Sequence, residues 1–415
     1  MNLAALLPEF QASYDALKAR GLKLDLTRGK PSAEQLDLSN ALLSLPGDAY
    51  IDRSGADTRN YGNTQGLLEL RELFGGILGI PAVQLLALGS SSLTIMHDVI
   101  AFALLHGVPG AIRPWAKEET VTFLCPVPGY DRHFAVTEKL GFRLRAVPLN
   151  DDGPDIAAVR KAIAEDPTIK GIWCVPTYSN PTGAIYSEDV ARALVSLEAA
   201  PDFRIMWDNA YFVHHLTDAR PPVIDILSLA AEAGNPDRVL VFASTSKITF
   251  PSAGVAFLGG SPANVAWWLD CQMTQSIGPD KLNQLRHVQF LRDAAGVEAL
   301  MAEHRALLAP KFDKVDEVFR EQLAPHGVGR WTTPKGGYFL TLFASQGVAQ
   351  RAVELAKEAG IAITPAGATH PYGNDPDDAV IRIAPSFPPI EDLEAGLRGF
   401  CAALLLAEAE KARRG

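Results

Sequence analysis

Short apolar runs recur through the middle of this chain, and they limit its fold more than any other feature of the sequence. Such runs suit strands that are buried on both faces, because a strand with one wet face alternates apolar and polar residues. Segments with helical spacing, such as residues 155–166, separate the runs. Strands that alternate with helices predict an α/β domain with a mainly parallel sheet. The expected strands cover residues 121–126, 142–149, 170–177, 202–208, 238–244 and 254–260.

The pattern changes after residue 280, where long helical stretches replace the short runs. Two further strands are expected at 336–343 and 379–385, and a helical segment closes the chain. We therefore expect two domains. A large domain spans residues 49–294, and a small α+β domain combines residues 1–48 with residues 295–415.

The composition is that of an ordinary globular protein, with 415 residues, 47% apolar content and a net charge of −10. An acidic chain without a block of basic residues is a poor binder of nucleic acid or anionic membranes. No apolar run approaches the length of a membrane span, and the N-terminal stretch meets Glu9 and Asp15 too early for a signal peptide. The four cysteines lack ligand spacing, so neither disulfides nor a metal site are expected. We expect a cytoplasmic protein.

One buried run ends on a lysine. Residues 239–243 are apolar or small, and Ser244, Thr245, Ser246 and Lys247 follow them. Most lysines are solvated surface groups, so the residue type alone says little. In α/β sheets, however, ligands gather at the carboxyl ends of strands. A desolvated lysine there can lose its proton and attack an aldehyde, and the neighbouring serines can donate hydrogen bonds to a phosphate.

Asp208 ends another run, at 202–208. A buried carboxylate costs several kcal/mol unless it has a partner. One interpretation is a cap for a helix that begins just after it. The other is a partner for a pyridinium nitrogen, a charge-assisted bond worth about 1.5–3 kcal/mol that keeps a pyridoxal ring protonated as an electron sink. Tyr211 and Asn180 would then reach the 3-oxygen of the ring, although Asn180 also suits a plain turn cap.

A Gly-Ser-Ser-Ser turn precedes an amphipathic helical stretch near residue 90. It places Ser90, Ser91 and Ser92 at a helix N-terminus, where free N–H groups, the helix dipole and hydroxyls favour a phosphate. A plain serine cap is the simpler interpretation of this turn when it is taken alone.

Taken together, the motifs resemble the fold-type I pyridoxal-phosphate enzymes of the class I/II aminotransferase group. The stretches "STSKIT" and "IGPDKLNQLRH" are most similar to the subgroup Ic aspartate aminotransferases. The resemblance covers essentially the whole chain, and it implies a cofactor-binding large domain whose mainly parallel sheet is of the seven-stranded type and is flanked by helices. The matching motifs are, in order, the serine turn, Asn180-Pro-x-Gly183, Asp208-x-x-Tyr211, Ser244-x-Ser246-Lys247 and the strand that carries Arg382.

For the cofactor, the resemblance implies that Lys247 holds pyridoxal 5′-phosphate as an internal aldimine and moves the substrate's Cα proton. Tyr130 would stack on the ring. Tyr61 would reach the phosphate of a neighbouring subunit, so a homodimer is expected. Many relatives carry an arginine shortly after the lysine as part of the phosphate site, but here neither Arg nor Lys occurs between Lys247 and Val255.

For the substrate, the resemblance implies that Arg382 binds the α-carboxylate, together with Asn180, and that Gly29 lies on a loop that closes over the site. An aspartate-specific enzyme also needs a cation for the distal carboxylate. We expect it in "IGPDKLNQLRH", at Lys281 or Arg286, although such charges are ordinarily a solvated helix face.

The expected activity is amino-group transfer between an L-amino acid, aspartate or glutamate first, and a 2-oxo acid. Two alternatives keep the fold: a lyase or decarboxylase, and an aminotransferase for aromatic or other amino acids. A third is a regulator of the MocR type, in which a DNA-binding segment precedes an aminotransferase-like domain. No basic helix-turn-helix pattern precedes the first helical segment here, and the net charge is negative.

Overall fold

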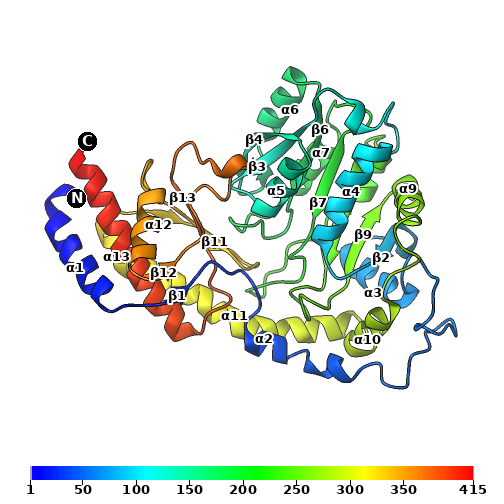
Figure 1. Ribbon diagram of the computed structural model, residues 1–415, viewed down its shortest axis with the longest axis horizontal. Helices are drawn as coiled ribbons and strands as arrows, with labels where there is room; N and C mark the ends of the chain where they lie inside the picture. Colours follow the sequence, from blue (N-terminus) through cyan, green and yellow to red (C-terminus); the bar gives the residue numbers. More distant parts are fainter. Residues whose placement is uncertain (1, 415) are drawn as a thin grey trace.

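The computed structural model describes residues 2–414, which form two sheet-based regions joined by one long helix (Figure 1). An eight-stranded sheet organises one region, and a three-stranded and a two-stranded sheet organise the other. Helix α11 (Ala294–Gln322) extends from the first region under the second. Helix α1 (Leu7–Ala19) packs along α13 (Ile390–Arg414), so the two ends of the chain lie side by side.

The large sheet has the strand order β2-β9-β8-β7-β6-β3-β4-β5. The neighbours from β8 to β4 are parallel, whereas β9, β2 and β5 each pair in antiparallel fashion. The predicted α/β class with a mainly parallel, helix-flanked sheet is confirmed, and the two-residue edge strand β5 adds an eighth strand to the expected seven. The strands are β2 (Leu85–Ala87), β3 (Thr122–Val127), β4 (Arg143–Asn150), β5 (Gly153–Pro154), β6 (Ile169–Cys174), β7 (Arg204–Asp208), β8 (Val239–Ser244) and β9 (Ala256–Gly260).

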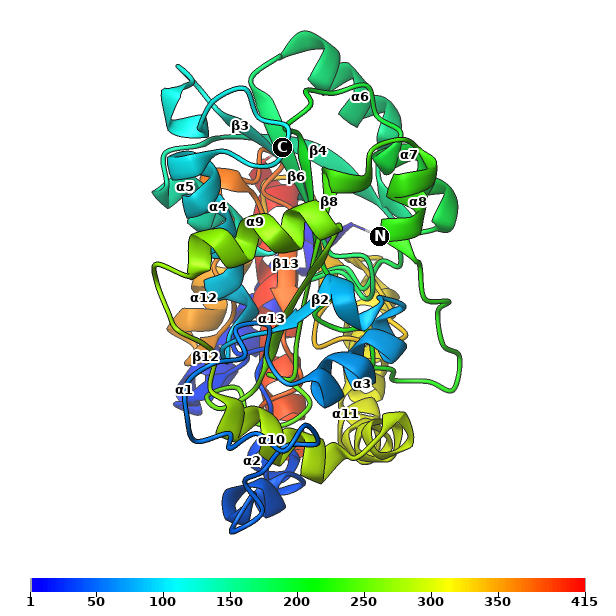
Figure 2. The same ribbon diagram turned by 90° about the vertical axis from the view of Figure 1, so that its right-hand side faces the viewer.

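Helices cover both faces of this sheet (Figure 2). Along β8, Val241 points into one apolar core while Phe242 points into the other, and both are almost fully buried. This is why the central strands are apolar throughout. The helices on the Phe242 side are α4 (Ser92–His106), α5 (Asp131–Lys139) and α9 (Pro262–Gln272), and those on the Val241 side include α3 (Leu68–Leu78), α6 (Ile156–Glu165), α7 (Glu188–Val195), α8 (Ile226–Glu232) and α10 (Lys281–Leu291).

The second region has an apolar core of its own, built by α1, α11, α13 and the small sheets. The two strands predicted at 336–343 and 379–385 are present but shorter than expected. The first begins only at Leu340, because residues 336–339 bend, and the second spans Val380–Ile383. The elements of this region are β1 (Leu24–Asp25), paired with β12 (Ile361–Ala362); β10 (Arg330–Trp331), β11 (Leu340–Phe343) and β13 (Val380–Ile383); and the helices α2 (Ala33–Asp37) and α12 (Ala349–Glu358).

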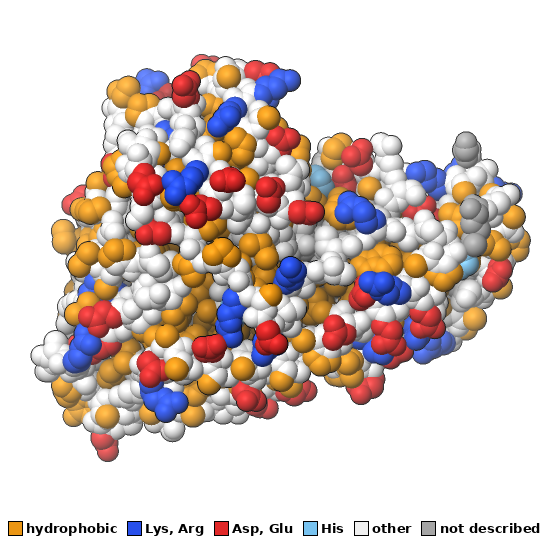
Figure 3. Space-filling view, turned by 180° about the vertical axis from the view of Figure 1, so that it is seen from behind, with side chains coloured by type: hydrophobic (Ala, Val, Ile, Leu, Met, Phe, Trp, Pro, Cys, Tyr) orange, Lys and Arg blue, Asp and Glu red, His pale blue; other side chains and the backbone are white. Residues whose placement is uncertain are grey.

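On the face of the described residues that Figure 3 shows, acidic and basic side chains are interspersed. No helix among residues 2–414 is long and apolar enough to cross a membrane.

Candidate active site

The lysine singled out by the sequence lies in a turn just beyond β8. Its side chain is partly buried, and its ammonium nitrogen lies 4.8 Å from the centre of the Tyr211 ring. Burial lowers the pKa of Lys247, while the carboxylate of Asp208 acts in the opposite direction. The amine is therefore closer to its neutral, nucleophilic form than a surface lysine is.

Asp208 is the last residue of β7, next to β8 in the sheet. Its Oδ2 lies 2.8 Å from Nε2 of His133, and its Oδ1 is buried without a hydrogen-bond partner among the described residues. A turn, not a helix, follows at 210–213, so the interpretation of Asp208 as a helix cap is wrong. A carboxylate with one oxygen held and the other free fits a pyridinium N–H.

His133 is a site residue that the sequence analysis missed. It lies in the first turn of α5, almost fully buried, and its ring stacks on Trp173 at 4.4 Å with an interplanar angle of 11°. This stacking fixes the plane of the imidazole that holds Asp208. The only signal in the sequence was its position three residues after Tyr130.

The serine turn lies at the start of α4, as the sequence predicts. Ser91 is the N-cap, and its Oγ accepts a hydrogen bond from the backbone N–H of Thr94. Across the turn, the carbonyl of Gly89 accepts from the N–H of Ala256, which lies in β9 beside β8. A hollow of about 430 Å³ opens beside this turn, and its lining residues include Gly89, Ser90, Ser91 and residues 278–280.

The lysine turn brings two more hydroxyls into this part of the molecule. Ser244 Oγ donates to Ser246 Oγ at 3.1 Å, so the two hydroxyls stay adjacent. Hydroxyls of this kind, and the free N–H groups at the start of α4, are groups that suit a phosphate.

Arg382 lies on β13 and comes from the second region, with 8% of its surface exposed. Its Nη1 donates to Asp131 Oδ1 at 2.7 Å and to Asn180 Oδ1 at 3.5 Å. Its guanidinium also lies 5.1 Å from the centre of the Phe339 ring. A Cβ on Gly29 would meet that same ring at 1.9 Å, so only glycine fits there. The structure thus brings Gly29, Asn180 and Arg382 together.

Two tyrosines line the same area. Tyr211 is buried, and Tyr130, the residue before α5, places its ring 4.9 Å from the ring of His133, edge to face. Burial raises the pKa of both phenols, and the charge of Asp208 adds to the effect. Both hydroxyls therefore stay protonated at neutral pH and can donate hydrogen bonds.

Three predicted residues lie on two other elements, the loop that holds Tyr61 and helix α10. Tyr61 is 81% exposed on its loop. Lys281 begins α10 and is only 7% exposed, and no carboxylate of residues 2–414 forms an ion pair with it. The interpretation as a solvated helix face is therefore wrong for Lys281. Arg286 donates from Nε to Asn283 Oδ1 at 2.8 Å.

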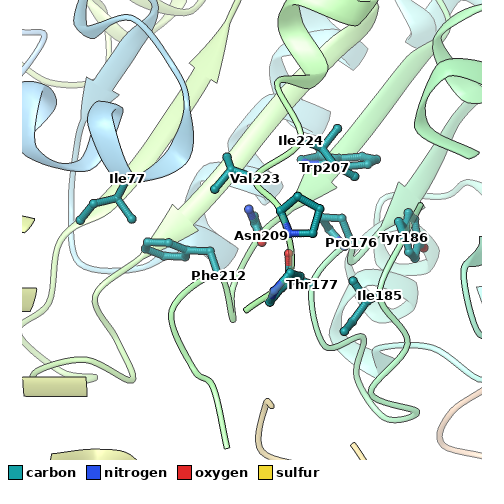
Figure 4. A pocket seen from close by; sticks show the side chains of 12 residues that line it. Ile77, Pro176, Thr177, Ile185, Tyr186, Trp207, Asn209, Phe212, Val223 and Ile224 are labelled. Atoms are coloured by element: carbon teal, nitrogen blue, oxygen red, sulfur yellow. The ribbon is translucent and has the colours of Figure 1, made fainter. Parts of the chain in front are cut away.

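A small hollow is lined by other residues (Figure 4). Its volume is about 30 Å³, room for a single water, and the buried Oδ1 of Asn209 has no partner among the described residues. Trp207, Phe212 and Ile224 supply much of its apolar wall, and none of the predicted site residues lines it. It suits an ordered water rather than a substrate.

Within residues 2–414, no group of three or more His, Cys, Asp or Glu side chains is placed to hold a metal ion. The described residues instead include a desolvated amine, a buried carboxylate with a free oxygen and a serine-rich helix start at the carboxyl edge of an α/β sheet. Fold and site together define a pyridoxal-phosphate-dependent transaminase of fold type I.

Comparison with known proteins gives the family. The model of the aspartate amino-transferase family matches residues 1–414, and the chain belongs to that family. An aspartate aminotransferase from Corynebacterium glutamicum is 50% identical over 404 residues, which cover 97% of this chain and 93% of that protein.

Solved structures agree with this assignment. A crystal structure of an aspartate transaminase from Corynebacterium glutamicum superimposes with a TM-score of 0.97 at 49% identity, covering 99% of this chain and 97% of the other. The α-aminoadipate aminotransferase LysN from Thermus thermophilus, at 22% identity, covers 96% of each chain with a TM-score of 0.74 and shares the fold.

Proposed function

We propose that this transaminase moves the amino group of aspartate or glutamate to a 2-oxo acid. The observation that carries the proposal is that two groups from opposite regions of the chain both act on Tyr211. The desolvated amine of Lys247 lies 4.8 Å from the centre of its ring, and the charge of Arg382, whose guanidinium contacts Asn180, acts to lower the pKa of its phenol. An amine reacts with a carbonyl, and a guanidinium binds a carboxylate in a two-pronged, charge-assisted pair. The similarity to aspartate aminotransferases supports the choice of donor.

The site fits pyridoxal 5′-phosphate at each of its polar ends. The free Oδ1 of Asp208 suits the ring nitrogen, the serine turn suits the phosphate, and Lys247 suits the aldehyde. When bound, the cofactor supplies an electron sink for the electrons left on the substrate Cα. Tyr130 would cover one face of the ring, and the phenol of Tyr211 would donate to its 3-oxygen.

In this proposal, the neutral amine of Lys247 takes the proton from the substrate Cα and later returns it. Asp208 keeps its charge beside the ring nitrogen, and His133 holds the carboxylate in position through Oδ2. Asn180 donates from its amide while its Oδ1 stays near Arg382. Gly29 leaves room for Phe339 under the guanidinium.

For the distal carboxylate we favour Lys281 over Arg286. Lys281 is buried and forms no ion pair with a carboxylate of the described residues. A cation at the first position of a helix is also unfavourable, because it lies next to the positive end of the dipole. A bound anion would offset both costs. Arg286 already donates to Asn283.

We also infer a division into a large domain of residues 49–294 and a small domain of residues 1–48 and 295–415. The support is that the small sheets and terminal helices enclose a core distinct from the two cores of the large sheet, and that α11 begins at the boundary.

We further propose a homodimer. Tyr61, Met273 and Ile277 are largely exposed, and their loops adjoin, since a Cβ on Gly278 would lie 2.8 Å from the carbonyl of Gly62. An isologous contact over this surface would bring Tyr61 to the partner's phosphate. A monomer with full activity at micromolar concentration would contradict it. We place the enzyme in the cytoplasm, because all four cysteines are free and buried.

The test is a panel of amino donors with 2-oxoglutarate or oxaloacetate as acceptor. Aspartate and glutamate should be the best donors, and pyridoxamine phosphate should accumulate when acceptor is withheld, which a lyase or decarboxylase would not produce. Lys281→Ala should cut activity with acidic donors by about 2–3 kcal/mol and leave alanine and phenylalanine unchanged. Arg286→Ala is the matched control on the same helix. An equal loss for acidic and neutral donors would remove Lys281 from the site.

A further inference from the structure

The guanidinium of Arg382 forms an ion pair with a carboxylate of the protein, that of Asp131. Asp131 Oδ1 lies 2.7 Å from Nη1, and the pair joins two residues 251 positions apart in the chain. Asp131 comes from α5, which packs on the large sheet, and Arg382 comes from β13 in the small sheet. The ion pair therefore ties the two regions of the molecule together at the place where the substrate must bind.

Asp131 occupies Nη1 of the guanidinium, whereas Nε is buried and has no hydrogen-bond partner among the described residues. Nη1 is also the nitrogen nearest to Asn180. A substrate carboxylate that used both Arg382 and Asn180 would need the position that Asp131 Oδ1 now holds, because two carboxylates on one edge repel each other.

The side chain of Asp131 can turn into solvent. Its side chain is 33% exposed, whereas that of Arg382 is 9% exposed, so Asp131 is the partner that solvent reaches. It is the first residue of α5, where the free N–H groups and the helix dipole stabilise a negative charge. Rotation into solvent would cost it one hydrogen bond and leave it at a favourable position.

We propose that Asp131 is an internal competitor for the substrate's α-carboxylate: it neutralises Arg382 while the site is empty and is displaced when substrate binds. The inference rests on the proposed function, because it takes Arg382 as the carboxylate site. The competition raises the apparent Kd, which equals the intrinsic Kd divided by the fraction of molecules in which the pair is open. It affects KM without entering the chemical step.

The test uses the holoenzyme and maleate, a dicarboxylate without an amino group that cannot be transaminated. Asp131→Asn should tighten maleate binding about two- to fivefold and lower KM for aspartate by the same factor, with kcat unchanged, as expected for a partly exposed pair. Glu138→Gln, which removes one charge from the exposed end of the same helix, should leave Kd and KM unchanged. The melting temperature of each variant shows whether it is folded.

A third variant separates this inference from the proposed function. In an Arg382→Lys background, adding Asp131→Asn should tighten maleate binding by a smaller factor than it does when Arg382 is present. Weaker or unchanged maleate binding in Asp131→Asn, with Arg382→Lys strongly impaired, would overturn the competition alone and make Asp131 a support for the guanidinium. If Arg382→Lys binds maleate as well as the unaltered enzyme does, Arg382 is not the carboxylate site and both ideas fail.

Discussion

The two ends of the site are built differently. The lysine end consists of Lys247, Asp208 and His133, which come from the ends of two adjacent parallel strands and from one covering helix. In its hydrogen-bonded pair, the side chain of His133 is 1% exposed and that of Asp208 is 4% exposed. The arginine end, Arg382 with Asn180 and Asp131, spans two regions of the chain and remains partly open. The group proposed for proton transfer therefore has almost fully buried partners, whereas the group proposed for recognition lies where the two regions meet and has a partner that solvent reaches.

The largest expected effect is at the lysine end. Lys247→Ala should lower kcat by about 10²–10⁴-fold through loss of proton transfer alone, and further through loss of the covalent link. It should still bind the cofactor, because the serine turn and Asp208 remain. Borohydride reduction of the unaltered holoenzyme, followed by peptide mass mapping, should find the cofactor on Lys247. Label on another lysine, or none, would break the assignment.

At the arginine end, Arg382→Lys should lower kcat/KM for aspartate by an amount equivalent to about 2–3 kcal/mol, since an ammonium cannot reproduce the two-pronged pair. The matched control is Arg330→Lys, which makes the same change in the same small sheet. The guanidinium of Arg330 also lies over an aromatic ring, 4.0 Å from the centre of Phe343. That control should change kcat/KM by less than twofold. A loss below about threefold for Arg382→Lys would make its role structural.

His133→Phe sharpens the comparison, because it keeps a ring to stack on Trp173 but removes the hydrogen bond to Asp208. A buried acceptor left without its partner costs about 1–3 kcal/mol, so the free energy of unfolding should fall by that amount. Turnover should fall about tenfold with little change in KM, because Arg382 is untouched. A change in KM alone would show that the two ends are not independent.

The smallest effect concerns stability and pH. Burial lowers the pKa of Lys247 in the folded protein below the ordinary lysine value of 10.5, so the folded apoprotein is penalised while the amine is protonated. The penalty is fully present below the folded pKa and disappears as the pH rises toward 10.5. Lys247→Met apoprotein should therefore be more stable than the unaltered apoprotein at neutral pH, and the difference should narrow toward pH 9.5. Urea unfolding at several pH values measures it. A difference that widens with pH would contradict the lowered pKa.

Much of the fold could be predicted because its signals are local. Each strand of the parallel set corresponds to a short apolar run in the sequence, and helix α4 begins directly after the serine that caps it. Strand β2 was missed because three residues give too short a pattern, and the antiparallel direction of β9 was missed because an apolar run carries no information on direction.

The sequence by itself determined which groups stand at strand ends: Lys247 after β8, Asp208 at the end of β7 and Arg382 on β13. The tertiary structure alone decided their partners. His133 and Asp208 are 75 residues apart, and Asp131 and Arg382 are 251 apart. The physical reason is that strand formation follows from nearby residues, whereas a contact between a helix and a distant strand depends on how the sheet orders its strands and on how the two regions pack.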